Sequence, residues 1–386
     1  MKVTVSVLGR FHAFDLAGQL LKRGHLHRLI TSYPKFIAAR FGIPKEKVAS
    51  ILAAEFIKRL WPKFPEFIRN IYNSQLFISN FYDILASFRV SKSDIFVGFS
   101  SVSLYSLRKA KKKGAKIILE RGSSHIVFQN DILKEEYEKY NLKPDLPHPK
   151  IIEKELREYQ EADYVSVPSS FVKRTFLEKG FPENKLIRVP YGVNLSQFSQ
   201  LPKNDDVFRV VFVGGMSIRK GFHYLLSAFS ELNLPNSELL LVGSYNNEIK
   251  YFFEKYKGKY KWIGAVPQSE LHKYYSQGSV FVLPSIEEGL GMVQLQAMVC
   301  GLPVVCTINT GGSDIVRDKV DGFVIPVRDV NALKEKIFYL YKNPDVLKKM
   351  GQSAKQRVVS GFTWDDYGEK MIEEYEKILN ADKNYD

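Results

Sequence analysis

Cysteine is scarce in this sequence, which holds only two among its 386 residues. Cys300 and Cys306 flank the apolar stretch 301–305 and show no metal-ligand spacing. We therefore expect two small buried side chains, and nothing in the cysteine pattern indicates a disulfide framework or an oxidising compartment.

Long apolar runs are also missing, since none reaches the roughly twenty residues that a membrane-spanning helix needs. The first residues, Met1 to Leu8, lack the apolar core and the cleavage site of a signal peptide and are predicted to form a strand. The sequence thus predicts a cytoplasmic protein, with peripheral contact at the inner face of a membrane left open.

Acidic residues are too few to balance the basic ones in the first half of the chain, whereas the second half is balanced. Residues 1–200 hold 33 Lys and Arg against 19 Asp and Glu, whereas residues 201–386 hold 23 of each. A basic surface suits an anionic membrane, a phosphorylated lipid acceptor or nucleic acid. No recognition motif accompanies the charge, so nucleic acid is not expected. Scattered solvated lysines are the alternative interpretation.

One stretch of the second half has the pattern of a strand, a loop, a helix and a second strand. The strands are predicted at 279–283 and 304–306, and the helix at 292–299, where apolar residues recur at helical spacing. Such a unit places its loop at the carboxyl end of a parallel sheet, where open α/β sheets bind ligands. Glu288 then lies at the amino terminus of the helix.

These residues resemble glycosyltransferase family 4, retaining nucleotide-sugar-dependent enzymes of the GT-B fold. The positions that match the family pattern are Pro284, Ser285, Glu288, Gly289, Leu290, Gly291, Ala297, Met298, Gly301, Pro303, Val304, Val305, Gly311 and Gly312. In the family a second Glu follows the first by eight positions and meets the ribose, but here that position is Gln296. An amide offers fewer acceptor sites to ribose hydroxyls than a carboxylate does.

The resemblance implies an α/β protein of two Rossmann-like domains that face a central cleft. We expect an acceptor-side domain over residues 1–198 and a donor-binding domain over residues 199–365. A C-terminal helix over about 366–386 should pack back on the first domain. No cofactor is implied, because the UDP- or GDP-linked sugar is a co-substrate.

The donor phosphates should meet loops that follow strands in both domains. Gly9 follows the first strand where the family carries glycines, and Gly214 and Gly215 follow the strand that begins at Phe208. Lys220 matches the family's phosphate-binding Lys. The family also has a phosphate-binding Arg at the position of Gly215, and we expect Arg219 to take that role here. Residues Gly243, Ser285, Gly289, Leu290, Gly291, Gln296, Gly311 and Gly312 complete the expected donor site.

On the acceptor side, the strand 116–119 leads into Glu120, Arg121 and His125. The family keeps a His here that touches the donor sugar, and counting from the strand puts Arg121 rather than His125 at that position. Glu120 is a candidate to orient the acceptor hydroxyl or accept its proton. In the alternative interpretation, Glu120 and Arg121 form a local ion pair and His125 is a capping residue.

A segment from Leu52 to Arg69 mixes aromatic with basic residues, as an amphipathic segment at a membrane surface does. Ordinary helix packing is the alternative.

The resemblance implies sugar transfer to a hydroxyl with retention, in the synthesis of polysaccharide, lipopolysaccharide or glycolipid. Glu288 is expected to contact sugar hydroxyls rather than act as a nucleophile, with the departing diphosphate accepting the proton. No Asp-x-Asp triplet is present, so no metal requirement is expected. An epimerase and a non-catalytic sugar-nucleotide binder are the alternative functions.

Overall fold

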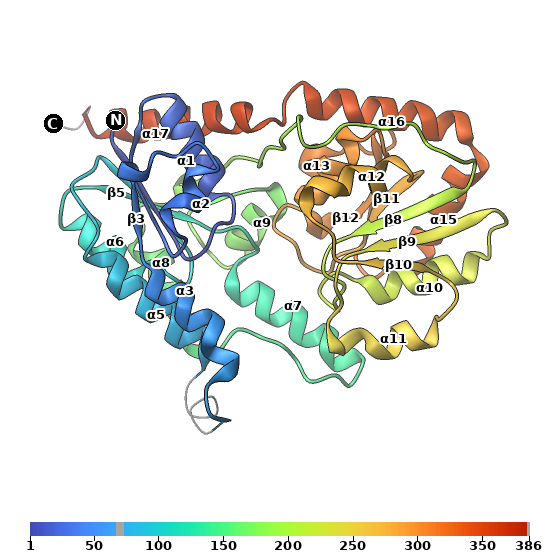
Figure 1. Cartoon of the computed structure of the whole chain (residues 1–386), viewed down its shortest axis with the longest axis horizontal. Coiled ribbons are helices and arrows are strands. Elements are labelled where there is room, and N and C mark those ends of the chain that lie inside the picture. Colours follow the sequence, from blue (N-terminus) through green and yellow to red (C-terminus); the bar gives the residue numbers. More distant parts are fainter. Residues whose placement is uncertain (67–72, 384–386) are drawn as a thin grey trace.

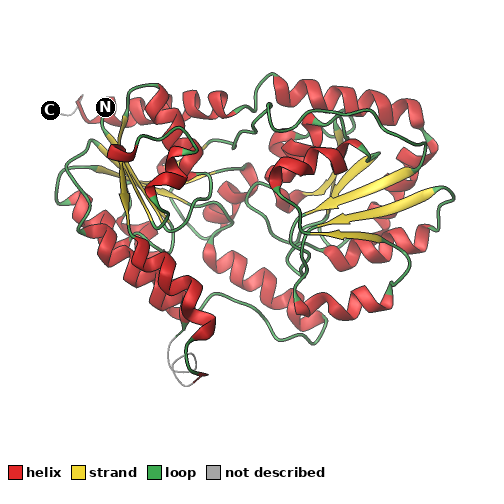
Figure 2. Ribbon diagram, in the orientation of Figure 1, coloured by secondary structure: helices red, strands yellow, loops and turns green. Residues whose placement is uncertain are grey.

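The computed structural model describes residues 1–66 and 73–383. It contains two parallel sheets, each flanked by helices on both faces (Figures 1 and 2). The last three positions of the segment predicted at 52–69 and the end of the predicted C-terminal helix, residues 384–386, lie outside the described residues.

The first sheet has seven strands in the order β3-β2-β1-β4-β5-β6-β7. Its strands are β1 Val3–Val7, β2 Leu26–Thr31, β3 Val48–Ser50, β4 Ile95–Phe99, β5 Lys116–Glu120, β6 Tyr164–Val167 and β7 Leu186–Arg188. The helices beside it are α1 Ala13–Lys22, α2 Lys35–Ala39, α3 Leu52–Leu60, α5 Ser74–Ser87, α6 Leu104–Lys111, α7 Ile126–Lys139, α8 Pro149–Glu161 and α9 Ser170–Glu178. The central strands β1 and β4 are buried along their whole length, as a parallel sheet covered by helices requires.

The second sheet has six strands in the order β10-β9-β8-β11-β12-β13. They are β8 Phe208–Val213, β9 Ser237–Val242, β10 Lys261–Gly264, β11 Val280–Leu283, β12 Val304–Thr307 and β13 Gly322–Ile325. Its helices are α10 Phe222–Leu232, α11 Lys250–Lys255, α12 Leu271–Ser276, α13 Met292–Val299, α14 Gly312–Ile315, α15 Val330–Lys342 and α16 Pro344–Val359. The predicted strand, loop, helix and strand around Glu288 are β11, α13 and β12.

The last helix, α17 Trp364–Lys383, returns from the second sheet to the first, along the upper edge of Figure 1. There it lies against α1, where Lys22 Nζ contacts Asp365 Oδ1 at 2.7 Å. In both sheets the order reverses about a central strand, so the carboxyl ends of β1, β4, β8 and β11 mark the switch points where such sheets bind ligands.

Both cysteines are buried and unpaired, as the sequence predicted. Helices α2, α5, α11, α12, α14 and α16 were not predicted. Helix α7 begins at Ile126, and the side chain of the preceding residue, His125, caps it by accepting a hydrogen bond from the amide of Val127.

Candidate active site

A cavity of about 1210 Å³ lies between the two sheets and takes its walls from both. The expected site residues that line it are Glu120, Arg121, Gly214, Gly215, Gly243, Glu288 and Gln296. They follow β5, β8, β9 and β11 or lie on α13, so the cavity is at the carboxyl ends of strands, as the fold predicts.

At the second-sheet side of the cavity, Glu288 binds two cations. Its Oε2 accepts hydrogen bonds from Lys220 Nζ and, at 3.2 Å, from Arg219 Nη1. Burial opposes ionisation of this carboxyl, but Lys220 and Arg219 outweigh that effect and lower the pKa of Glu288 to about 2. The site therefore holds an ionised carboxylate between two positive groups.

Two loops must come unusually close to build this cluster. Gly221 has a φ of +61°, and a Cβ on it would lie 1.9 Å from the carbonyl oxygen of Pro284. Only glycine fits there, which allows the loop after β8 to reach the loop after β11. Ile286 N also donates to Arg219 O at 2.9 Å, so the two loops are joined directly beside the charged groups.

Glu287, which sequence reasoning missed, lies beside Glu288 and is fully buried. One of its oxygens accepts hydrogen bonds from Ser123 Oγ (2.6 Å), Ser124 N (2.9 Å) and Ser124 Oγ (2.7 Å). The other accepts from Gln129 Nε2 at 3.1 Å. Burial disfavours its charge, yet Arg219 and the serine donors outweigh burial and lower the pKa of Glu287. Nothing in the sequence marked it, since the family pattern names only the second residue of the Glu-Glu pair.

Gly289 brings the two halves of the molecule into direct contact. A Cβ on Gly289 would lie 1.8 Å from the carbonyl oxygen of Gly122. Ser169 Oγ donates to Gly289 O at 2.6 Å, which fixes the loop from a second side. Gly289 shapes the loop that carries Glu288, and it is not itself a cavity wall.

Several other expected donor residues do not line the cavity either. Gly312 N donates to Thr310 Oγ1 at 3.2 Å, and Gly9 N donates to Ser32 Oγ at 3.0 Å, so both amides are already engaged. Lys220 and Arg219 also lie outside the lining: both contact Glu288, which does line it, and Arg219 lines a second cavity of about 330 Å³. The remaining expected donor residues outside the lining are Ser285, Leu290, Gly291 and Gly311. These residues pack the loops rather than the cavity surface.

Gln296 does face the cavity from α13. Its Oε1 accepts a hydrogen bond from Tyr275 OH at 3.1 Å, and the residue is 6% exposed. One acceptor of the amide is thus used inside the protein, which leaves its NH₂ group for a ligand.

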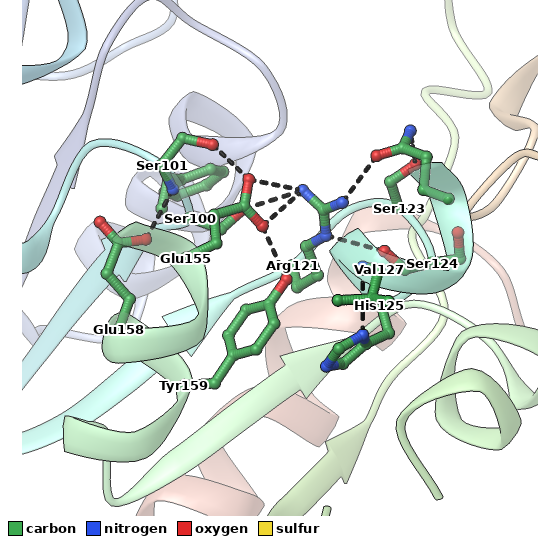
Figure 3. A network of polar contacts seen from close by, with 12 residues as sticks. Ser100, Ser101, Arg121, Ser123, Ser124, His125, Val127, Glu155, Glu158 and Tyr159 are labelled. Carbon is green, nitrogen blue, oxygen red and sulfur yellow. Dashed lines mark hydrogen bonds and ion pairs between the residues drawn. The ribbon is translucent and has the colours of Figure 1, made fainter. Parts of the chain in front are cut away.

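Arg121 and His125 occupy different surroundings (Figure 3). Arg121 lines the cavity and binds Glu155 at 3.0 Å and Gln129 Oε1 at 2.8 Å. His125 lies outside the lining, with its ring packed against the rings of Tyr159 and Phe176 and its Nδ1 accepting from the amide of Val127. Burial lowers the pKa of His125 to about 4, so the imidazole is neutral. The structure thus places Arg121 at the cleft and gives His125 the position of a helix cap.

Glu120 and Arg121 do not form the local ion pair of the alternative interpretation, because each has another partner. Glu120 Oε2 lies 3.1 Å from Nε2 of His12, and both side chains line the cavity. Sequence reasoning assigned no role to His12. It follows β1, whereas Glu120 ends β5, and no local pattern links positions so far apart.

Aromatic and basic residues form the outer wall on the first-sheet side. Phe11 and Phe41 line the cavity with Arg10 and Lys58, and Arg10 lies 4.9 Å from the centre of the Phe41 ring. Among the described residues, no helix is long and apolar enough to cross a membrane. In the same part of the chain, no group of three or more His, Cys, Asp or Glu side chains is arranged to hold a metal ion.

Two family models together match almost the whole chain. The model described as Glycosyltransferase Family 4 matches residues 10–197, and the model described as Glycosyl transferases group 1 matches residues 194–357. The chain belongs to glycosyltransferase family 4. The boundary between the two matches coincides with the passage from the first sheet to the second.

Curated relatives match this family 4 chain over part of its length. An uncharacterized glycosyltransferase of Haemophilus influenzae is 30% identical over 218 residues, which cover 54% of this chain and 58% of the relative. The capsular polysaccharide biosynthesis glycosyltransferase CapM of Staphylococcus aureus is 27% identical over 237 residues, covering 56% and 62%. The matched part therefore spans less than two thirds of these relatives.

Solved structures match the family 4 chain along nearly its full length. Sucrose-phosphate synthase from Thermosynechococcus elongatus has a TM-score of 0.70 at 19% identity and covers 99% of this chain and 100% of that one. Anabaena HepE, solved in complex with UDP-glucose, has a TM-score of 0.68 at 14% identity, with coverages of 98% and 100%. The fold is GT-B, as the resemblance predicted.

Proposed function

We propose that this chain transfers a hexose from a UDP- or GDP-linked donor to a hydroxyl acceptor, with retention and without a metal ion. Family membership and the GT-B fold support this function. Anabaena HepE, a protein of the same fold, was solved with UDP-glucose bound.

The observation that carries the proposal is the charged cluster of Lys220, Arg219 and Glu288 at the edge of the cavity. Negative charge develops on the diphosphate as its bond to the sugar breaks, and cations already in place stabilise that charge. Lys220 and Arg219 are held by Glu288 before any ligand arrives. The fold therefore orders these two side chains in advance, so they are preorganised for an anion.

Glu288 is suited to contact hydroxyls of the transferred sugar. Retaining glycosidases form a covalent intermediate with two carboxylates about 5 Å apart that flank the bond. The neighbouring carboxylate here is Glu287, which is fully buried and bound to Ser123, Ser124 and Gln129. It has no free oxygen for such chemistry, so we favour attack on the same face from which the diphosphate leaves.

Exposed side chains beside the first-sheet wall of the cavity support a particular acceptor class. We propose an anionic, lipid-linked hydroxyl acceptor used in polysaccharide, lipopolysaccharide or glycolipid synthesis. Exposed apolar side chains on the β1–α1 loop, α2 and α3 continue outward from the cavity wall; they are Phe11, Phe36, Phe41, Leu52 and Phe56. Exposed cations accompany them, namely Arg10, Lys35, Arg40, Lys45, Lys58, Arg59 and Lys63. Apolar rings beside cations fit an anionic lipid surface.

The test is a donor screen in the presence of EDTA. Purified protein is incubated with UDP-glucose or with GDP-mannose, and release of the nucleoside diphosphate is followed with and without a lipid-linked acceptor. We expect turnover of at least one donor, and we expect NMR of the product to show the donor's anomeric configuration. Binding without any turnover would support a non-catalytic binder, and an epimerised free sugar would support an epimerase.

A further inference from the structure

A strained phenylalanine lies in the loop between β1 and α1. Phe11 has a φ of +41°, in the left-handed region that costs a bulky residue free energy. The residue is 70% exposed, so burial of its ring offsets little of that cost. Phe11 therefore adds little to the stability of the fold, and a backbone outlier that a fold nevertheless keeps points to a function.

The ring of Phe11 lines the outer wall of the large cavity. It faces the ring of Phe99, with centroids 6.4 Å apart and an angle of 19° between the planes. Phe41 lines the same wall, is 38% exposed, and packs on the buried ring of Phe14 at a centroid distance of 5.4 Å. Two rings are thus held in position on one side of the cavity, and each leaves apolar surface open to a ligand.

Two cations on the same wall have no anionic partner. Arg10 follows β1 and Lys58 lies on α3, and neither makes an ion pair or a hydrogen bond within residues 1–66 and 73–383. The guanidinium of Arg10 lies 4.9 Å from the centre of the Phe41 ring. Arg121, by contrast, is already bound to Glu155. Arg10 and Lys58 are therefore free to bind an anionic group of a ligand.

Exposed rings beside unpaired cations favour a ligand that is apolar and anionic at once. A phosphate group can accept charge-assisted hydrogen bonds from Arg10 and Lys58. An apolar chain next to it would cover the rings and remove their surface from water. A neutral sugar would leave the cations unpaired, and inorganic phosphate would leave the rings exposed. A phosphorylated lipid satisfies both kinds of group.

We propose that the outer wall binds the phosphate and the adjoining carbons of a lipid-phosphate acceptor, and that Phe11 selects the lipid chain. Phe36 and Phe56 are exposed on α2 and α3 but do not line the cavity, so their role at a membrane is separate from that of Phe11. The strained backbone of Phe11 is kept because a relaxed loop would direct the ring elsewhere. This inference rests on the proposed function, since it names the class of acceptor.

The experiment measures binding of geranyl phosphate, geraniol and inorganic phosphate to the purified protein by calorimetry. UDP or GDP is present throughout to occupy the expected donor site, so that phosphate groups do not bind there. We expect geranyl phosphate to bind at least about tenfold more tightly than either fragment, because it engages both the rings and the cations. Arg10→Gln and Lys58→Gln should each weaken its binding by about tenfold, the scale of a lost charge-assisted hydrogen bond.

Phe11→Asn isolates the ring from the backbone, because asparagine enters the left-handed region far more readily than phenylalanine does. This variant should bind geranyl phosphate about tenfold more weakly, while Phe11→Tyr, which keeps the ring, should match the wild type. The double variant Phe36→Ser, Phe56→Ser should also match it. The urea midpoint of Phe11→Asn should equal or exceed that of the wild type, which a ring that merely stabilised the fold would not allow.

Geranyl phosphate affinity in Phe11→Asn within about threefold of wild type, a difference of well under 1 kcal/mol, would overturn the inference. Equal binding of geranyl phosphate and geraniol by the wild type would also overturn it, since the cations would then have no part. If Phe11→Asn does not fold, Phe11→Gly decides by the same readouts, and a lower urea midpoint in both variants would show a structural role instead. A wild type that binds neither UDP nor GDP would contradict the proposed function itself.

Discussion

Glu287 of the second sheet's loop accepts two hydrogen bonds from Ser124 of the first domain, at 2.9 Å from its amide and 2.7 Å from its hydroxyl. The adjacent residue in the chain, Glu288, binds the two cations of the donor side. Contact between the two halves of the molecule and the order of the charged cluster are therefore set by neighbouring residues on one loop.

Replacing Glu287 should weaken the fold as well as catalysis. Glu287→Gln removes the charge that faces Arg219 and leaves donors from Ser123, Ser124 and Gln129 poorly matched. We expect the free energy of unfolding to fall by roughly 3 kcal/mol, the scale for breaking a buried charged pair. Chemical denaturation measures it, with Glu254→Gln on the exposed face of α11 as the control. A change below about 0.5 kcal/mol, the scale of surface substitutions, would show that the contact is unimportant.

Glu288→Gln should separate turnover from binding. The amide keeps the shape of the side chain but frees Lys220 and Arg219 from their counter-ion, so UDP or GDP should bind as well as before or more tightly. Because the sugar contact is altered, kcat should fall by about 100-fold or more. Calorimetry and initial rates measure the two quantities. Equal losses in binding and turnover would place Glu288 on the nucleotide instead of the sugar.

His125 should make the fold sensitive to acid. Burial lowers its pKa from 6.5 to about 4, so the unfolded chain binds a proton at a higher pH than the folded chain does. Stability should therefore fall as pH drops below 6.5, and should level off near 4. His125→Asn keeps a capping side chain without the titration.

We expect the wild type to lose about 1 to 2 kcal/mol relative to His125→Asn between pH 7 and pH 5. Urea denaturation at the two pH values measures it. Parallel behaviour of the two proteins would mean that folding does not lower the pKa of His125.

The exposed rings on α2 and α3 should bind an anionic surface. Phe36 and Phe56 are 54% and 64% exposed, and basic side chains surround them. The double variant Phe36→Ser, Phe56→Ser should reduce co-sedimentation with phosphatidylglycerol vesicles by about tenfold or more, since it removes two insertable rings. Phe338→Ser, on α15 of the other domain, is the matched control. Equal binding by both variants, or binding to neutral phosphatidylcholine vesicles alone, would contradict a role for this surface.

Local patterns predicted many of the strands and helices, and the family resemblance predicted how they are arranged. The apolar strands of both sheets and the helix after Glu288 follow from periodicity and from glycine positions, and the family motif drew attention to Lys220 and Glu288. These features are encoded within short stretches of chain, so the sequence alone carries them.

The rest of the site depends on contacts between distant segments. His12 and Glu120 are separated by 108 residues and Glu287 and Ser124 by 163, so no spacing rule relates them. His125 was a cleft candidate by residue type, yet the backbone of α7 uses it as a cap. Helix α5 was not predicted, although its buried residues Ile78, Tyr82 and Ala86 recur every four positions.

The central claim is that a nucleoside diphosphate binds against Lys220 and Arg219. Calorimetric titration of UDP and GDP into the wild type, Lys220→Met and the exposed control Lys257→Met tests it most directly. We predict that one nucleotide binds the wild type and Lys257→Met alike, and binds Lys220→Met about 10 to 100 times more weakly, the scale of a lost charge-assisted hydrogen bond. Unchanged affinity in Lys220→Met, or no binding of either nucleotide to the wild type, would contradict the claim.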